Sequence, residues 1–195
     1  MSSKSTPAPA NTSATVLCQT RSPSGFLTLG LCCLLLGLYQ GGLIAFPALV
    51  AVGFIYGGLS QAVTGIHEWR HGNAFGAAAF VSCGLFWLSL LPILILPDAG
   101  IAKPFDAFAS VPYLIMWSLF VGILAHGAGQ TEKITGVIFG ALALLLGLVA
   151  ATLVWEPALL RQATCLFGVA TGLLATAKGL SLQGLYLARR RALTT

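Results

Sequence analysis

The side chains best able to do chemistry are few, and they lie at the ends of long apolar stretches. One short segment, His67-Glu68-Trp69-Arg70-His71, holds two of the three histidines and a glutamate. It superficially resembles the HExxH motif of zinc proteases, which lies on a helix, but here it falls between two apolar stretches. We therefore interpret it as an interfacial cap, with Trp69 anchored among lipid headgroups. No metal site and no cofactor are expected.

Two of the polar residues inside apolar stretches stand out. Lys178 falls near the middle of the last stretch, and a lysine at the centre of a membrane-spanning helix costs about 2.5–3.5 kcal/mol on insertion scales. It is therefore an anion-attracting site, a side chain that reaches the interface along its flexible stem, or a sign that the span is shifted. Gln61 is the other candidate for a pathway, because its amide cannot easily satisfy itself on its own backbone, as Ser and Thr hydroxyls do.

A possible carboxylate-handling group follows the first of these stretches. Glu68 is a candidate proton exchanger, or alternatively an interfacial ion-pair partner of Arg70 or another basic residue. Asn73 and the backbone amides around Gly72 precede the next apolar stretch. The start of a helix favours anions, so this position could bind a carboxylate.

Composition restricts the class of protein. Of the 195 residues 57% are hydrophobic and 8% are charged, whereas soluble domains carry roughly 25% charged residues. A polytopic membrane protein is therefore expected. The chain shows no paired acid and base or nucleophile that would indicate an enzyme, and no basic patch interleaved with aromatics that would indicate nucleic-acid binding. The five cysteines form no ligand or disulfide pattern.

Six segments approach the roughly 20 apolar residues that a membrane-spanning helix requires. They are Phe26–Phe46, Ala48–His67, Phe75–Leu96, Val111–His126, Ile134–Trp155 and Ala163–Leu187. Only Gly41-Gly42 and Pro47 break the pattern between the first two, and we place a tight turn there because proline blocks helix continuation. The fourth is short, and an earlier start near Phe105 is allowed for. The expected fold is an all-α membrane protein, a bundle of six helices over residues 23–188. Residues 1–22 form a disordered tail and residues 189–195 a basic tail.

An even number of spans places both termini on the same side of the membrane. That side then carries seven basic residues, Lys4, Arg21, Arg70, Lys133 and Arg189-Arg190-Arg191, and the other side carries two, Lys103 and Arg161. Basic residues concentrate in cytoplasmic loops. A multi-pass protein of the plasma membrane with both termini in the cytoplasm is therefore expected. Pairs such as Gly168 and Gly172 predict close packing between helices.

The second and third spans carry a specific motif. Gly53-Phe54-Ile55-Tyr56-Gly57-Gly58-Leu59-Ser60-Gln61, followed by Gly72-Asn73-Ala74-Phe75-Gly76 and Gly84-Leu85-Phe86-Trp87-Leu88, resembles the acetate uptake transporter family, the succinate–acetate permeases. The resemblance is strong from Ser22 to Leu96. The family signature before the first span, Asn-Pro-Ala-Pro-Leu-Gly-Leu, is matched here to Ser22–Thr28, where only Pro23 is kept.

The resemblance implies a six-helix protomer with a pathway through its own bundle, assembled as a homohexamer. It implies transport of acetate and related small carboxylates, linked to a proton. The Phe, Tyr and Leu that narrow the pathway of bacterial members align with Leu31, Cys83 and Ala141, and a position linked to substrate choice aligns with Ala175. The smaller side chains at the first three positions suggest a wider constriction, since a wider apolar neck is easier to wet. Tyr56, Gln61, Glu68, Gly72 and Asn73 are the candidates for the substrate-binding groups and the mouth.

Two other functions stay open from the residues. One is a channel for an uncharged solute of the urea or amide type, which also has six spans. The other is a membrane protein that transports nothing, such as a sensor or an assembly factor.

Overall fold

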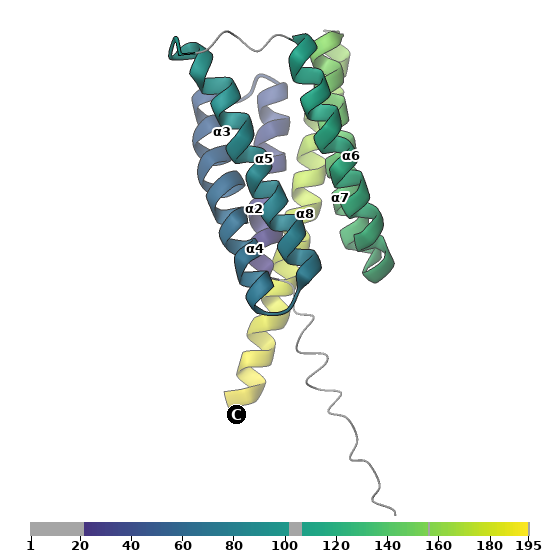
Figure 1. Ribbon diagram of the computed structural model, residues 1–195. Coiled ribbons are helices and arrows are strands. Elements are labelled where there is room, and N and C mark those ends of the chain that lie inside the picture. Colours follow the sequence, from purple (N-terminus) through teal and green to yellow (C-terminus); the bar gives the residue numbers. More distant parts are fainter. Residues whose placement is uncertain (1–21, 102–106, 156, 195) are drawn as a thin grey trace, which may run out of the picture.

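The computed structural model describes residues 22–101, 107–155 and 157–194. Within them six helices are long and apolar enough to cross a membrane, which confirms the expected six-helix bundle (Figure 1). The first is α2 (Pro23–Gln40), and the second is a continuous run of α3 (Phe46–Val52), η1 (Gly53–Ser60) and α4 (Gln61–Arg70). The others are α5 (Ala74–Asp98), α6 (Ala107–Thr131), α7 (Lys133–Val154) and α8 (Ala158–Thr194).

The turn between the first two spans lies earlier than expected. Helix α2 ends at Gln40 instead of Phe46, and Gly42 follows with a φ of 72°. The amide of Leu43 bonds the carbonyl of Leu38 and that of Gly42 bonds the carbonyl of Tyr39, which is the glycine-terminated helix end known as a Schellman motif. Pro47 lies in the first turn of α3, where a proline costs no hydrogen bond.

Three other helices also differ from the expectation at their ends. Helix α4 continues to Arg70, so most of the HEWRH segment is helical and not a loop. Helix α6 reaches Thr131, beyond the expected end at His126, and it begins at Ala107, between Val111 and the earlier start near Phe105 that was allowed for. Helix α8 continues to Thr194 and includes most of the expected basic tail. The expected N-terminal tail lies almost wholly outside the described residues.

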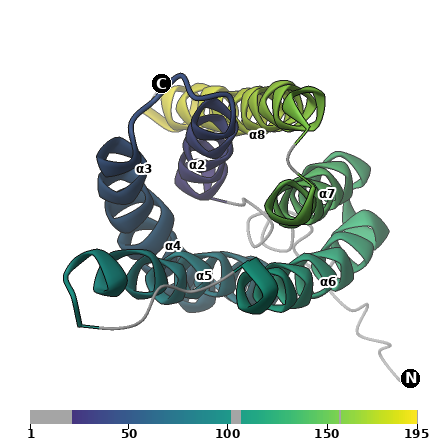
Figure 2. The same cartoon turned by 90° about the horizontal axis from the view of Figure 1, so that it is seen from above.

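The helices associate as three pairs. α2 packs mainly on α8, α6 on α7, and the run η1–α4 on α5, and the pairs surround the bundle axis (Figure 2). Glycines permit the close approach within each pair. A Cβ at Gly168 would lie 2.7 Å from the Cα of Gly37, and one at Gly136 would lie 2.7 Å from the Cα of Gly129. Small residues at such contacts allow backbones to pack closely in lipid, and they hold each pair together.

Polar contacts cross the seams between the pairs. Gln40 Nε2 donates to Thr152 Oγ1 at 3.0 Å, joining α2 to α7. The hydroxyls of Ser89 and Tyr113 lie 2.7 Å apart and join α5 to α6. Each contact satisfies polar atoms that would otherwise be costly in an apolar interior. The helices are thus closely packed within each pair and joined by polar contacts between pairs. Space remains at the bundle axis, which the pairs surround.

For orientation, the upper end of the bundle is the end with the turn between α2 and α3. The lower end holds the turns between α4 and α5 and between α6 and α7. In Figure 1 the last part of α8 projects beyond the lower end.

Candidate functional site

Two neighbouring cavities lie inside the bundle. The larger, here named the vestibule, has a volume of about 370 Å³ and lies towards the upper end. The smaller, here named the neck, has a volume of about 20 Å³, which is room for about one water molecule. Leu36, Phe86, Trp87 and Leu146 border both cavities. The two therefore form a single path from the upper end to the middle of the bundle.

The vestibule carries most of the strongly polar side chains of the path. Tyr39, Gln40, Ser110 and Tyr113 contribute to its wall. The hydroxyl of Tyr113 also donates to the carbonyl of Phe86 at 3.2 Å, so the wall is held in place by the α5–α6 seam. The rest of the lining is apolar: Leu36, Leu49, Phe86, Trp87, Leu90, Ile93, Leu94, Pro97, Leu114, Leu146, Val149 and Leu153.

The neck is apolar and aromatic. Its lining consists of Leu29, Cys32, Cys33, Leu36, Ser82, Cys83, Phe86, Trp87, Trp117, Phe120, Val121, Leu124, Leu142 and Leu146. The rings of Phe86 and Trp117 meet edge to face with centroids 5.4 Å apart. None of the side chains in this lining is charged. An anion in the neck would therefore lose its hydration without meeting a compensating charge.

Below the neck the bundle interior is filled by aromatic rings. Phe26 and Phe80 form an edge-to-face pair with centroids 5.5 Å apart, and both are buried. Phe80 also lies directly over Gly25, where any Cβ would come within 2.4 Å of its ring. Gln61, 1% exposed, donates from Nε2 to the carbonyl of Gly25 at 3.3 Å, while its Oε1 has no partner among the described residues. In this conformation the path is closed below Cys83.

Glu68 lies at the lower end and is only 2% exposed. Its carboxylate accepts from the backbone amide of Ser22 and from Asn73 Nδ2, each at 2.5 Å. Asn73 Oδ1 in turn accepts from the amide of Gly76 at 3.0 Å and caps α5. Gly72 has a φ of 77° and terminates α4. At the start of the third span, where we expected a bound carboxylate, Asn73 contacts the carboxylate of Glu68.

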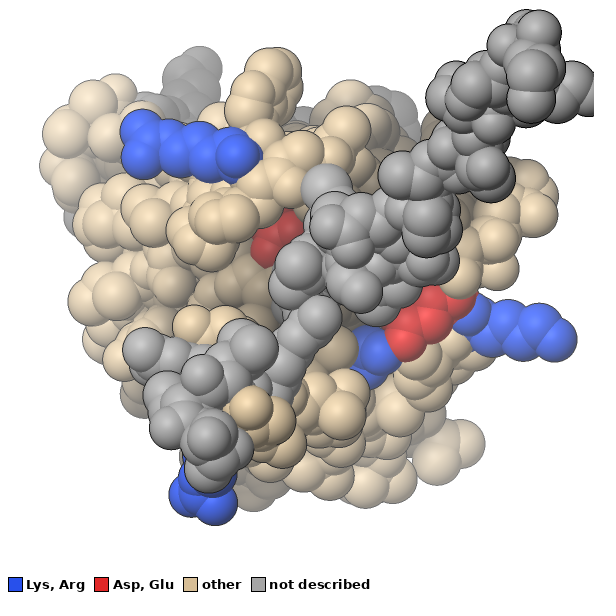
Figure 3. Space-filling model, turned by 90° about the horizontal axis from the view of Figure 1, so that it is seen from below, with Lys and Arg blue, Asp and Glu red and all other residues tan. Residues whose placement is uncertain are grey.

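Arg70 is exposed and forms no ion pair with Glu68 in the described part of the chain. In the view of the lower end, one acidic group (red) is recessed among other side chains (tan), and a second lies at the surface between two basic side chains (blue) (Figure 3). Another carboxylate at this end belongs to Glu132, at the turn between α6 and α7.

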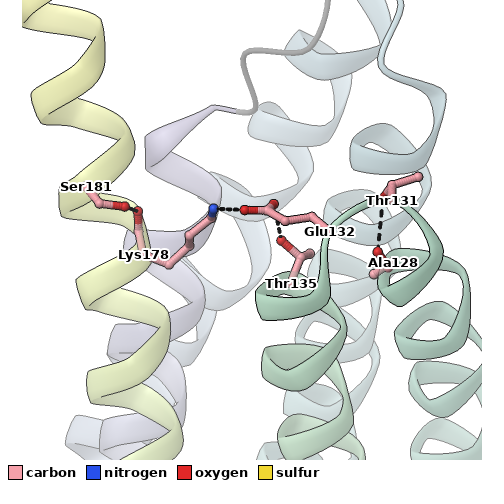
Figure 4. A network of polar contacts seen from close by, with 6 residues as sticks. All are labelled: Ala128, Thr131, Glu132, Thr135, Lys178 and Ser181. Atoms are coloured by element: carbon pink, nitrogen blue, oxygen red, sulfur yellow. Dashed lines mark hydrogen bonds and ion pairs between the residues drawn. The ribbon is translucent and has the colours of Figure 1, made fainter.

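Lys178 is paired with Glu132 (Figure 4). Its Nζ contacts Glu132 Oε1, and Thr135 donates to Glu132 Oε2 at 2.7 Å. The lysine and glutamate side chains are 13% and 34% exposed. Lys178 therefore lies level with the first turn of α7 at the lower end, and not at the centre of the span as its sequence position suggested. An anion at Lys178 would have to compete with the carboxylate already there.

Sequence reasoning missed Glu132. It is the only acidic residue between the fourth and fifth spans, and a lysine inside an apolar stretch demands a nearby countercharge. These two facts together could have indicated the pair.

Of the four positions aligned with the family's constriction and substrate-choice residues, Cys83 lines the neck. Leu31, Ala141 and Ala175 border neither cavity, and Ala175 is buried in the apolar core of the bundle. Leu142, beside Ala141, lines the neck instead.

On α2 the neck is lined by Leu29, Cys32, Cys33 and Leu36, which lie on either side of Leu31 in the sequence. The family signature ends Pro-Leu-Gly-Leu. Matching its second proline to Pro23 aligns its glycine with Gly25, where a Cβ would clash with Phe80. The position aligned with Leu31 then falls at Leu29.

Two further candidates lie outside the path. Tyr56 is 43% exposed on the outer side of η1, where the π-helical winding of Gly53–Ser60 accommodates Trp87 against Gly57. His67 and His71 follow the residue order of the zinc motif and their rings lie 4.2 Å apart, but Glu68 turns inward. Among the described residues no cluster of three metal ligands occurs.

Comparisons with known proteins agree with this architecture. An uncharacterized protein of Methanothermobacter thermautotrophicus is 34% identical over 168 residues, 82% of each chain. The succinate-acetate/proton symporter SatP of Escherichia coli K12 is 33% identical over 130 residues, 66% of this chain and 69% of SatP. The solved structure of the bacterial acetate channel SatP superposes with a TM-score of 0.76 at 30% identity, over 81% of this chain and 88% of that one.

A family model fits nearly the whole chain. It matches residues 5–186 and includes all six spans except the end of α8. Together with the six-helix fold and its internal cavities, this match assigns the protein to a group of multi-pass membrane transporters and channels: the chain belongs to the GPR1/FUN34/yaaH family.

Proposed function

We propose that this protein moves acetate and related small carboxylic acids across the membrane, along the path formed by the vestibule and the neck. The observation that carries the proposal is the uncharged neck between a vestibule with polar side chains in its wall and a buried carboxylate at the lower end. The names of its relatives, a succinate-acetate/proton symporter and an acetate channel, support the choice of substrate.

The acid crosses the neck in its protonated, neutral form. A carboxylate stripped of water costs much more than a neutral acid in an apolar site, and the neck lining offers no cation to offset that cost. The vestibule, with Tyr39, Gln40 and Ser110 in its wall, provides partners for the hydrated substrate before it enters.

Glu68 exchanges the proton at the lower end. It is buried, and its two hydrogen bonds come from Ser22 and Asn73, so its proton uptake is coupled to the start of α2 and of α5. By the distribution of basic residues, this lower end and both termini face the cytoplasm. The protein acts in the plasma membrane as a homohexamer, each protomer with its own path.

The width of the neck depends on more than Cys83. Phe86, Trp87, Trp117 and Phe120 occupy the space that a small side chain at position 83 leaves. The proposed passage of acids larger than acetate therefore requires these rings to rotate, with Cys83 giving them room to do so.

The test is uptake of labelled solutes by vesicles containing the purified protein. Acetate uptake that rises as the external pH falls supports the proposal. Urea uptake without pH dependence would indicate a channel for uncharged solutes, and absence of any uptake would indicate a sensor or an assembly factor.

A further inference from the structure

A groove on the outside of the bundle, here named the outer groove, lies apart from the path. It has a volume of about 420 Å³ and is lined by Trp69 and Gly72 at the lower end and by side chains of α5 between Ala74 and Ser82. Ala78 in this lining is exposed, whereas Cys83, on another face of α5, is buried in the wall of the neck. The outer groove therefore faces the surroundings of the protein and not the path.

The length of the outer groove matches one leaflet of a bilayer. Ala74 is the first residue of α5, and the rise of an α-helix places Ser82 about 12 Å further along the axis. Half of the hydrocarbon core of a bilayer is about 15 Å thick. Because α5 crosses the membrane, the groove follows the acyl chains of the leaflet at the lower end, from the headgroups nearly to the middle of the bilayer.

The lower end of the outer groove carries a positive charge. Arg70 lies between two lining residues, Trp69 and Gly72, in the last turn of α4, and its side chain is exposed. It forms no ion pair in the described part of the chain, and the neighbouring Glu68 is turned inward and 2% exposed. The ring of Trp69 is 77% exposed, as is typical of tryptophans that lie among headgroups. The apolar groove thus begins beside an exposed cation at headgroup level.

We infer that the outer groove binds an anionic phospholipid of the leaflet at the lower end, with one acyl chain along α5 and the phosphate at Arg70. A neutral lipid would fill the apolar part equally well, but a headgroup with a net negative charge also gains from the arginine, whose guanidinium pairs with phosphate oxygens. Ser82 lines both the outer groove and the neck, so the bound chain ends against the wall of the path. This inference does not depend on which solute the protein transports.

The experiment measures quenching of tryptophan fluorescence by lipids with brominated acyl chains, which quench an indole ring that they touch. Trp69 and Trp155 are the most exposed of the four tryptophans, at 77% and 64%. Trp155→Phe therefore leaves Trp69 as the main reporter. This protein is purified, placed in phosphatidylcholine vesicles and titrated with brominated phosphatidylglycerol or with brominated phosphatidylcholine that has the same chains. Addition of Trp69→Phe should remove the signal that distinguishes the two lipids.

Phosphatidylglycerol should reach half of its maximal quenching at an about fivefold lower mole fraction than phosphatidylcholine, the effect of one basic residue near an anionic surface. Arg70→Gln should abolish this preference. Its control is Arg161→Gln, the same change at an exposed residue near the start of α8 at the upper end, which should leave the preference unchanged. Ala78→Phe, which fills the groove, should also abolish the preference, whereas Ala170→Phe at an exposed position of α8 should not.

Equal quenching by the two lipids in the Trp155→Phe protein would overturn the inference. A preference that survives either Arg70→Gln or Ala78→Phe would also overturn it, because the lipid would then be held elsewhere. Protection of Trp69 from both brominated lipids would show that a second copy of the chain covers the groove, and this result too would contradict a lipid site.

Discussion

The side-chain amide of Asn73 donates to the carboxylate of Glu68, with 2.5 Å between Nδ2 and Oε2. The carbonyl oxygen of the same Asn73 caps α5. A buried carboxylate is thus built into the N-terminus of a pathway helix, where the helix dipole favours negative charge. Protonation of Glu68 would weaken this hydrogen bond, which joins α4 to the start of α5. Binding of a proton would therefore alter the packing of these two helices at the lower end.

Glu68→Gln should remove the coupling between protonation at position 68 and transport. The amide is nearly the same size and cannot ionise, so uptake at a fixed concentration of protonated acetic acid should have the same rate at pH 5 and pH 7. The measurement is the ratio of initial uptake rates at the two pH values. The same ratio in Glu68→Gln as in the unaltered protein would exclude Glu68 as the proton-exchanging group.

The ion pair between Lys178 and Glu132 gives a second prediction. Lys178→Met and Glu132→Gln should each lower the thermal unfolding midpoint, because each leaves one partly buried charge without its partner. The double variant should be more stable than the sum of the single effects indicates, by about 0.5–1 kcal/mol, as for partly exposed pairs. Strict additivity would show that the two side chains do not interact.

The same variants distinguish a structural role of Lys178 from a role in anion binding. If the ion pair only stabilises the packing of α8 on α7, both single variants should retain acetate uptake to a similar extent. A large loss in Lys178→Met with normal uptake in Glu132→Gln would instead show that the lysine charge itself attracts the substrate.

The glycine contact between α2 and α8 predicts a third result. Gly168→Ala should destabilise the protein by about 1–3 kcal/mol, because its Cβ would lie 2.7 Å from the Cα of Gly37, and backbone can yield only if the helices separate. The matched control is Gly122→Ala on α6, where a Cβ meets nothing within 4 Å. Equal unfolding temperatures for the two variants would contradict close packing of this pair.

Cys83→Tyr tests the width of the neck. Cys83 is buried in the neck wall, and a phenol ring there should slow a larger acid such as succinate more than acetate. Cys165→Ser is the control, since Cys165 lies outside both cavities beside Gly41. If Cys83→Tyr slows acetate and succinate by the same factor, position 83 does not set the size limit.

The span count and the family motif were readable from the sequence because both depend on local features. Apolar length alone indicates a membrane helix, and the run from Gly53 to Gln61 is distinctive by itself. Helix ends were less predictable. Gly42 terminates α2 through its backbone conformation, whereas the sequence offered both Gly41-Gly42 and Pro47 as the break between the first two spans.

The site depended on contacts that sequence order does not reveal. Lys178 and Glu132 are 46 residues apart, and so are Ser22 and Glu68. None of the α2 residues that line the neck was among the candidates, because a single retained proline left the alignment of α2 ambiguous by two residues.

The most direct test of the account is solute uptake into vesicles by the purified protein, with labelled acetate, succinate and urea at two pH values. We predict saturable acetate uptake that is faster at the lower pH, together with little uptake of urea. Urea uptake that exceeds acetate uptake and does not change with pH would contradict the account.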